Sequence, residues 1–362
     1  GYFPYIAVIA VYLFVRFQVL GGFAPWKGHD DFRGELSTYQ NVINIFPLFI
    51  LYLKKLLLPV GLNAWYVFHP ITSLREGLLP FVGTIVFAVF IFVAWRKNRM
   101  AFFSLILVVL PLLPVFYIPA ISVPFSERYL YLPSFGFVLL AALFIDTIIA
   151  KRKWIFPVLT LTLAVIIFYF LETMQRNTVW KDNYTFWTDT VRNSPAGLIP
   201  RYNLGVELLA RGRIDDAIVQ LRTALRLNPD FSPARNNLGT AYMRKGLMDE
   251  AIAELLTAVR IDPKYAVAHN NLGSADGEKG LAGMAIEEFK VAVELKPDFA
   301  DAYNNLGISY WKSGDLEKAV MYCGKAVSLS PYNTSYRDNL SSVKEVKRFR
   351  DENMLKMKNT GP

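Results

Sequence analysis

The chain has 362 residues, of which 53% are hydrophobic, and a formal net charge of +9. This length allows two or more domains, and the hydrophobic fraction is high for a water-soluble protein. The positive charge lies mainly in the first half, with a net charge of +7 through Arg176 and +2 beyond it. Since the second half carries no basic stripe, the composition argues against a nucleic-acid partner.

Five apolar runs in the first half approach the length of about 20 residues that a membrane span needs. They cover residues 1–20, 79–95, 101–120, 129–150 and 154–172. Basic clusters follow two of these runs, at 96–99 and 151–153. Because positively charged loops face the cytoplasm, the last span should run outward. We therefore expect an integral protein of the inner or endoplasmic reticulum membrane, with its second half on the periplasmic or lumenal side.

The apolar run at 42–62 is ambiguous, because Lys54 and Lys55 interrupt it and prolines flank it. A complete span would require both lysines to extend to a membrane surface. A re-entrant or interfacial helix on the outer side avoids that cost and is the favoured interpretation, while a full span stays open. Together these segments predict a transmembrane helical domain over residues 1–175.

The second half repeats itself every 34 residues. Prolines, glycines and alanines recur with this period, at Pro195, Pro229, Pro263, Pro297 and Pro331, at Gly205, Gly239, Gly273 and Gly307, at Gly212, Gly246, Gly280 and Gly314, at Ala217, Ala251, Ala285 and Ala319, and at Ala224, Ala258, Ala292 and Ala326. This period, with small residues at a helix crossing and proline at the exit, is typical of the tetratricopeptide repeat, or TPR. The pattern predicts four repeats, at 198–231, 232–265, 266–299 and 300–333, that share a continuous core.

Two segments should complete the array. Residues 176–197 are expected to form a connecting helix equivalent to the second helix of a repeat, and residues 334–362 a capping helix with a basic tail. The predicted fold class is therefore all-α: a polytopic transmembrane helical domain followed by a TPR α-solenoid.

The third repeat departs from the pattern of its neighbours. It has Asp276, followed by Gly277, where the second and fourth repeats have Tyr242 and Tyr310. Because glycine inside a helix costs roughly 1 kcal/mol relative to alanine, we expect this repeat to be the least stable.

Motifs of soluble enzymes are scarce in this sequence. It has no Walker loop, no Gly-x-Ser-x-Gly and no metal-ligand cluster, so neither a metal nor a cofactor is predicted. The three histidines, His29, His69 and His269, have no common spacing. We expect His269 to be a partly exposed structural residue, because histidine is commonly of intermediate burial. The single Cys323 falls at a core position of a repeat and should be a buried thiol.

Residues 126–136, SERYLYLPSFG, place a charged pair at the outer mouth of a predicted span. One interpretation is an interfacial anchor in which Glu127 pairs with Arg128 and Tyr129 and Tyr131 join the aromatic belt. The other is an anion site at headgroup depth, where the Arg128 guanidinium binds a phosphate. The residues alone leave both open.

This segment resembles the Ser-Glu-Arg-x-Leu-Tyr-x-Pro-Ser-x-Gly stretch of the transmembrane and TPR-containing protein O-mannosyltransferases. Residues 57–62, LLPVGL, and residues 176–187 resemble the same family, as does the order of parts. The resemblance implies a polytopic glycosyltransferase that moves a sugar from a polyprenyl-phosphate donor to an extracytoplasmic protein or glycan. Its donor site would include Arg128, Glu127, Tyr129 and Tyr131. We expect this chain to lack the loop that carries the family's catalytic acid, so the catalytic residues stay unknown.

Asparagines form a further periodic set on the predicted first helix of each repeat. They are Asn203, Asn237, Asn271, Asn305 and Asn339, each directly before a leucine. Asparagine is a poor helix former, and its amide suits a peptide backbone, so we predict a ladder that binds an acceptor peptide on the concave face. The Asn-Asn-Leu-Gly text resembles the TPR array of the O-linked N-acetylglucosamine transferases, where such a ladder binds substrate backbones. Alternatively, these amides bond neighbouring repeats or water.

Two other functional classes stay open. The chain could belong to a non-catalytic membrane-anchored TPR scaffold, although five spans exceed what an anchor needs. It could also be an O-antigen-ligase-type membrane protein, some of which carry TPRs. The partners that we expect are membrane lipid, a polyprenyl-phosphate sugar donor, and a protein or peptide bound on the concave face of the repeats.

Overall fold

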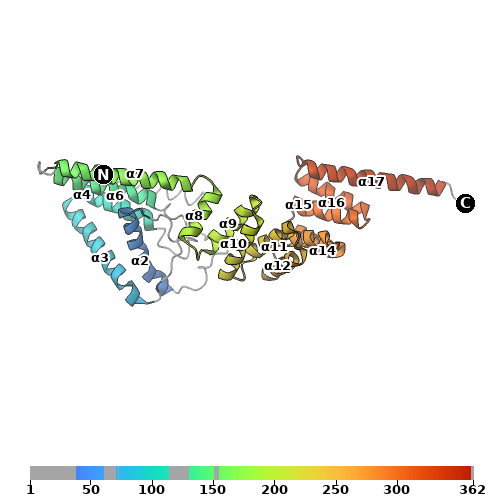
Figure 1. The fold of residues 1–362 in the computed structure, drawn as a ribbon, viewed down its shortest axis with the longest axis horizontal. Helices are drawn as coiled ribbons and strands as arrows, with labels where there is room; N and C mark the ends of the chain where they lie inside the picture. The colour runs from blue at the N-terminus through green and yellow to red at the C-terminus, as the bar shows by residue number, and fades with distance from the viewer. Residues whose placement is uncertain (1–37, 61–70, 72, 114–129, 151–154, 360–362) are drawn as a thin grey trace. The chain divides into compact units, whose positions relative to one another are not determined.

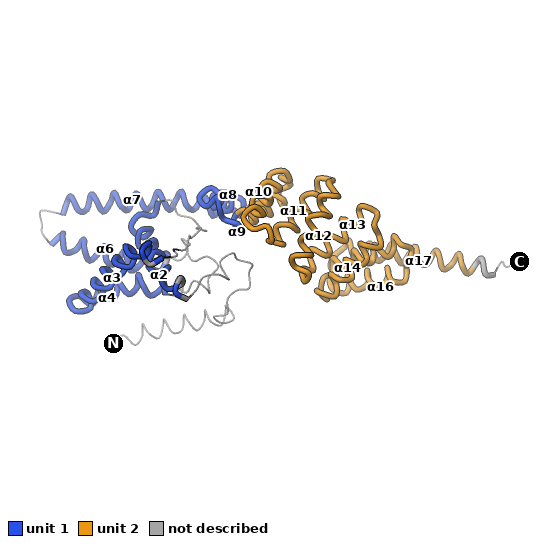
Figure 2. The backbone as a smooth tube through the Cα atoms, turned by 90° about the horizontal axis from the view of Figure 1, so that it is seen from below, with its two compact units in different colours: residues 1–200 blue, residues 201–362 orange. Residues whose placement is uncertain are grey.

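The computed structural model describes residues 38–60, 71, 73–113, 130–150 and 155–359 (Figure 1). Within these residues every regular element is a helix. The chain forms two compact units, residues 1–200 and 201–362, shown in different colours in Figure 2. Each unit is described by itself.

The first unit contains long apolar helices. Its elements are α2 (Thr38–Leu57), α3 (Leu74–Lys97), α4 (Arg99–Val109), the 3-10 turn η1 (Leu110–Leu112), α6 (Tyr131–Ile149), α7 (Ile155–Val179) and α8 (Asn183–Asn193). Three helical stretches are long and apolar enough to cross a membrane: Arg75–Lys97, Leu132–Ile149 and Ile155–Val179. They coincide with three of the predicted spans. Their apolar side chains are largely exposed, as expected for helices that face lipid.

The other membrane predictions are only partly described. The run at 1–20 lies outside the described residues, and the run at 101–120 is seen as a shorter apolar helix, Arg99–Leu112, whose continuation also lies outside them. α2 is continuous through Pro47 and ends at Leu57. Its buried Leu48 and Tyr52 pack in a cluster that includes Leu112. Whether α2 spans the membrane or is re-entrant stays a prediction.

Two polar contacts fix α2 within this unit. The side chain of Asn44, fully buried, donates from Nδ2 to the Ile71 carbonyl at 3.0 Å and accepts from the Ile71 amide at 2.8 Å. The Tyr169 hydroxyl on α7 donates to the carbonyl of Leu56 at 2.8 Å, close to where α2 ends. Both contacts give hydrogen-bond partners to backbone groups that make no bond within a helix. Leaving such groups unpaired in an apolar environment costs free energy.

The repeat unit is a series of helix pairs (Figure 1). The pairs are α9 (Leu198–Ala210) with α10 (Ile214–Leu227), α11 (Ser232–Lys245) with α12 (Met248–Ile261), α13 (Ala266–Glu278) with α14 (Ala282–Leu295), and α15 (Ala300–Lys312) with α16 (Leu316–Leu329), followed by α17 (Thr334–Asn359). The first helix of each pair begins at the residue that the 34-residue period predicts. The all-α fold class is therefore confirmed.

Small residues let the two helices of each pair approach closely. A Cβ on Gly239 of α11 would lie 2.6 Å from Leu255 Cγ and 3.1 Å from the Ala251 carbonyl oxygen on α12. Ala251 and Ala258 on α12 are fully buried, like the equivalent alanines of the other repeats. Gly246 ends α11 in the left-handed conformation, with φ of +78°, which glycine adopts without steric cost.

The two ends of the predicted array differ in their boundaries. The segment predicted as one connecting helix contains the end of α7, a turn, and then α8, which starts after Asp182 because its carboxylate accepts the Thr185 amide at 2.8 Å. The capping helix α17 extends through the predicted basic tail to Asn359. Val343 on α17 is fully buried in a cluster with residues of α14 to α16, so this helix closes the core of the fourth repeat.

Candidate functional site

The predicted donor-binding residues lie at the edge of what the structure describes. Glu127, Arg128 and Tyr129 fall outside the described residues, and Tyr131 is the first residue of α6. Their role in donor binding stays a prediction. The segment's last residue has a structural role, because a Cβ on Gly136 would lie 2.7 Å from the Val108 amide nitrogen. Gly136 thus allows α6 to pack against α4 at backbone distance.

A second family-like segment surrounds the turn between α7 and α8. Arg176 at the end of α7 forms an ion pair with Asp189 on α8, with Nη1 2.5 Å from Oδ2 and both side chains largely buried. Beside it, the rings of Trp180, Phe186 and Trp187 form a chain of contacts with centroids 4.7 Å apart at each step. The ion pair and the aromatic contacts fix the direction in which the chain leaves α7.

The asparagines of the predicted ladder bond from one repeat to the preceding one. Four of them donate from Nδ2, and each acceptor lies 35 residues earlier. The bonds are Asn237 to the Tyr202 hydroxyl at 3.2 Å, Asn271 to Asn236 Oδ1 at 2.9 Å, Asn305 to Asn270 Oδ1 at 3.1 Å, and Asn339 to Asn304 Oδ1 at 3.0 Å. The fifth, Asn203, is half-buried on α9. These bonds agree with the alternative interpretation of the sequence, in which the asparagine amides bond neighbouring repeats.

The acceptors link these bonds into a relay. Asn270 donates on to Asn271 at 3.4 Å, and Asn236 donates to Asn237 at the same distance. Hydrogen bonds therefore run in one direction from Asn305 through two repeats to Tyr202. The Asn271 amide also donates to the Thr240 hydroxyl at 3.4 Å. Asn237, Asn305 and Asn339 each use one of their two N–H donors in the bond between repeats, so donor capacity is left on these three amides for a peptide. Binding of an acceptor by this ladder stays a prediction.

A second periodic pair connects the two helices of each repeat, and sequence reasoning missed it. Its members lie 19 residues apart: Arg201 with Gln220 at 2.8 Å, Arg235 with Glu254 at 2.7 Å, His269 with Glu288 at 2.6 Å, and Tyr303 stacked on Tyr322 with ring centroids 6.3 Å apart. Apart from the arginine that the first two repeats share and the glutamate that the second and third share, the residue types change from repeat to repeat, so no identity runs through the array at this position. A comparison of side-chain chemistry at fixed register would have found it.

His269 is more buried than we expected from the sequence. Its side chain is about nine-tenths buried, because it lies between Glu288 on α14 and the Pro263 carbonyl, which Nε2 approaches to 3.1 Å. Both ring nitrogens thus face acceptors. The hydrogen bond to Glu288 is the largest cause that raises the pKa of His269, and burial opposes it. His269 is therefore buried and not partly exposed, so this part of the sequence prediction is wrong.

The third repeat contains a buried carboxylate. Asp276 is 1% exposed, and neither of its carboxylate oxygens has a hydrogen-bond partner. In the second repeat the equivalent Tyr242 hydroxyl accepts a bond of 2.9 Å from Arg222, which lies 20 residues earlier. The residue 20 before Asp276 is the exposed Leu256, so both members of this pair between repeats are replaced at Asp276. Burial raises the pKa of Asp276, and the nearby Glu288 raises it further.

Among the described residues, no three His, Cys, Asp or Glu side chains lie close enough together to hold a metal ion. Cys323 is fully buried, as predicted, and burial raises its pKa to about 11, so its thiol is poorly nucleophilic.

Family models for the tetratricopeptide repeat match residues 202–266 and 300–333, and a further TPR model matches 283–314. Among curated proteins, the chain is 26% identical over 255 residues to protein O-mannosyl-transferase TMTC1 of Mus musculus, covering 63% of this chain and 26% of that protein. It is 28% identical over 202 residues to protein O-mannosyl-transferase F38B6.6 of Caenorhabditis elegans, with coverages of 54% and 29%. The chain is a TPR protein similar to the protein O-mannosyl-transferases.

The chain spans less than a third of the length of these relatives. Its match to protein O-mannosyl-transferase tmtc2 of Xenopus laevis is 34% identical over 131 residues, covering 34% of this chain and 15% of that protein. Among solved structures, MamA matches 46% of this chain and 96% of its own at 24% identity, with a TM-score of 0.39. The thermophilic TPR protein TTC0263 of Thermus thermophilus matches 44% of this chain and 88% of its own at 23% identity, with a TM-score of 0.41.

Proposed function

We propose that this chain is the part of a membrane O-mannosyl-transferase that joins the end of the membrane domain to the acceptor-binding repeats. One observation carries the proposal. The similarity to TMTC1 covers 63% of this chain, whereas residues 201–362 make up less than half of it. The similarity therefore extends beyond the repeat unit, which a common TPR array alone would not produce. The three apolar helices supply the membrane location that a lipid-linked donor requires.

In this proposal the membrane part binds a polyprenyl-phosphate mannose, and Arg128 binds its phosphate through the guanidinium fork. A charge-assisted hydrogen bond contributes roughly 1.5–3 kcal/mol, so Arg128→Ala should reduce donor use about ten- to a hundredfold. Lysine keeps the charge without the fork and should restore only part of the activity.

The test measures mannose transfer by the full-length protein from a radiolabelled polyprenyl-phosphate donor to membrane proteins, with Arg128→Ala and Arg128→Lys in parallel. Transfer that both variants retain would support the interfacial-anchor interpretation of Arg128 and leave the enzyme intact. No transfer by wild type, together with retained binding of partner proteins to the repeats, would instead support the scaffold hypothesis.

The repeats are proposed to lie on the extracytoplasmic side. Cys323 is the chain's single cysteine and is fully buried, so introduced thiols can be labelled against a low background. Lys264→Cys, at an exposed turn between repeats, should react with an impermeant maleimide in intact cells or sealed lumen-out vesicles. Lys97→Cys, in the basic cluster at the end of α3, should react only after permeabilisation. The reverse pattern would overturn the topology.

The acceptor is proposed to lie along the asparagine ladder. Changing Asn237, Asn271 and Asn305 together to Ala should weaken binding of an unfolded acceptor polypeptide to the full-length protein. Because these amides also bond between repeats, the melting temperature should be measured in the same preparation. Acceptor affinity that stays unchanged in this variant would refute the ladder as a peptide site.

A further inference from the structure

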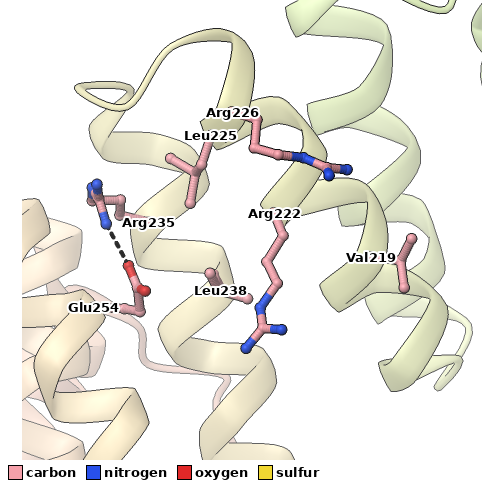
Figure 3. Close-up of a pocket in the computed structure, with 7 residues that line it drawn as sticks. All are labelled: Val219, Arg222, Leu225, Arg226, Arg235, Leu238 and Glu254. Carbon is pink, nitrogen blue, oxygen red and sulfur yellow. Dashed lines mark hydrogen bonds and ion pairs between the residues drawn. The ribbon is translucent and has the colours of Figure 1, made fainter.

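A shallow groove with an arginine rim opens in the repeat unit, away from the asparagine ladder. Its volume is about 440 Å³, and its lining residues come from α10, α11 and α12: Val219, Arg222, Leu225, Arg226, Arg235, Leu238 and Glu254 (Figure 3). None of the five ladder asparagines is among them. The groove lies entirely within the first two repeats, in residues 201–362.

The charges in this groove are unbalanced. At one side Arg235 is paired with Glu254 and also donates from Nε to the Pro229 carbonyl at 2.9 Å (Figure 3). Within the part of the chain that the structure describes, Arg222 and Arg226 have only neutral hydrogen-bond partners: Arg222 donates to the Tyr242 hydroxyl, and Arg226 to the Thr223 hydroxyl at 2.9 Å. No carboxylate of the described residues lies within 4 Å of either guanidinium, so the groove has a net positive charge.

The two arginines lie four residues apart on α10, where equal charges repel each other and destabilise the helix. The nearby Arg201 adds a third guanidinium, and its pKa is lowered first by burial and then by the charge of Arg226. Both side chains of the pair are exposed. Arg222 and Arg226, which no carboxylate of the described residues approaches within 4 Å, are complementary to an anionic ligand.

The cluster is local, because the other repeats do not reproduce it. At the register of Arg222 and Arg226, the next repeat has Leu256 and Arg260, and the third has Lys290 and Glu294. A nucleic acid would need a basic stripe that continues over several repeats. A membrane surface would contact protruding residues, whereas Leu225 and Leu238, both more than nine-tenths buried, line this groove.

We infer that this groove binds an acidic peptide segment in which carboxylates flank an apolar side chain. The guanidiniums of Arg222 and Arg226 would bind the carboxylates, which they match in geometry as two-pronged donors. The apolar side chain would lie on Leu225 and Leu238. The volume falls within the range of pockets that bind small ligands or a few side chains. This site does not depend on the mannose transfer proposed above.

The experiment uses the full chain in detergent micelles and a fluorescent Gly-Ser peptide that contains the sequence Glu-Glu-Leu-Glu. A matched peptide contains Gln-Gln-Leu-Gln. Fluorescence anisotropy should show binding of the acidic peptide that weakens with added salt, and weaker binding of the neutral peptide by about tenfold or more. Equal binding of the two peptides would overturn the inference, and so would no binding of either.

Two variants locate the site. Arg226→Gln should weaken binding of the acidic peptide about tenfold. This is the lower end of the range for the loss of a charged hydrogen bond, because the Arg226 side chain is exposed. Arg260→Gln, at the equivalent position one repeat later, removes the same charge and should change the affinity less than about twofold. Equal effects of the two variants would mean a general charge effect and overturn the groove. Displacement of the peptide by short single-stranded DNA or phosphatidylserine at lower concentration than by unlabelled peptide would overturn the peptide as the occupant.

Discussion

The two units use the same backbone structure but distribute their apolar residues differently. In the repeat unit, α12 buries Ala251, Leu255 and Ala258 on one face, and it also carries four charged side chains, at positions 249, 250, 254 and 260. In the membrane unit, α7 is apolar around most of its circumference and has no buried residue. The hydrophobic effect drives apolar side chains into the core only where the other face of the helix contacts water. The sequence pattern therefore identifies the buried face of a repeat helix, but not of a membrane-spanning helix, which lipid surrounds.

The units nevertheless share one device, a glycine where two helices cross. Gly239 faces Leu255 and the Ala251 carbonyl in the repeat unit, and Gly136 faces the Val108 amide in the membrane unit. In water, close approach completes an apolar core, whereas in lipid it supplies van der Waals contact that no hydrophobic effect provides. Substitutions at these glycines test how far the comparison holds.

The largest effect is expected for Gly239→Leu. The new side chain would overlap Leu255 and force α11 away from α12, which should lower the free energy of unfolding of the repeat unit by about 3 kcal/mol. Thermal unfolding followed by circular dichroism measures this. As a control, Gly324→Ala on α16 meets no atom within 4 Å and should stabilise the repeat by about 0.5–1 kcal/mol, because alanine is the better helix former. A tolerated leucine at 239 would show that the helix pairs can separate without loss of the core.

Gly136→Ala extends the test to the membrane unit. Because the added methyl would meet backbone atoms of α4, which cannot rotate away, we expect a loss of about 2 kcal/mol. The monodisperse fraction that survives heating in detergent should decrease relative to wild type. Gly83→Ala on α3 is the control, since its Cβ would meet only the flexible Ile50 side chain end at 3.0 Å. Equal heat resistance of the two variants would contradict close packing of α4 and α6.

The repeat unit could be predicted from the sequence almost completely, because its period constrains many positions at once. The alanines on α10, α12, α14 and α16 all occupy the predicted core, and each first helix starts where predicted. The same period identified the asparagine positions. It could not identify their hydrogen-bond partners, because donor and acceptor lie 35 residues apart, one more than the period. The two residues of each bond therefore occupy different positions within their repeats.

The membrane unit could be predicted only as spans. Hydropathy located three helices but carried no information on which helix packs against which, since all of their faces are apolar. The Asn44 contact with the Ile71 backbone illustrates the limit: a single polar residue without a periodic equivalent has no pattern to identify it. The arginine groove escaped prediction for a related reason, because Arg235 comes from a helix other than that of Arg222 and Arg226.

Asp276 distinguishes the third repeat from its neighbours, and its effect should depend on pH. Burial raises its folded-state pKa above the ordinary 3.8, so the folded protein binds this proton more tightly than the unfolded one. The resulting stability is present below pH 3.8 and is lost as the pH rises through the raised value. The pKa of His269 is also raised, from 6.5, so the stability that its protonation contributes is likewise lost as the pH rises above 6.5. The melting temperature should therefore fall as the pH rises above 6.5.

Asp276→Asn is the matched variant, since an amide of equal size carries no charge. It should stabilise the repeat unit by roughly 1–2 kcal/mol at neutral pH, because an unpartnered buried carboxylate no longer ionises. At pH 4 the difference from wild type should shrink. His269→Gln should remove the part of the pH dependence that lies above 6.5 and keep the rest. A wild-type melting temperature that rises between pH 6.5 and 8 would contradict the assignment for His269, and an Asp276→Asn variant that is no more stable than wild type at neutral pH would contradict the one for Asp276.

The smallest change in stability is expected for the asparagine relay. Here polar side chains join neighbouring helices, whereas at Gly136 and Gly239 the absence of a side chain lets the helices approach. Asn271→Ala removes the 2.9 Å bond to Asn236 Oδ1 and the longer 3.4 Å bond to Thr240 Oγ1. The shorter bond contributes about 0.5–1.5 kcal/mol, and the higher helix propensity of alanine offsets several tenths of this loss. The single variant should thus change the free energy of unfolding little.

A double-mutant cycle of Asn271→Ala and Asn236→Ala isolates the bond between the two residues, with an expected coupling energy of about 0.5–1 kcal/mol. Asn271→Ala with Asn339→Ala should be additive, because Asn339 bonds to Asn304 and shares no partner with Asn271. Additivity in both cycles would mean that the amides do not join the repeats, and it would favour the hypothesis that they serve an acceptor peptide.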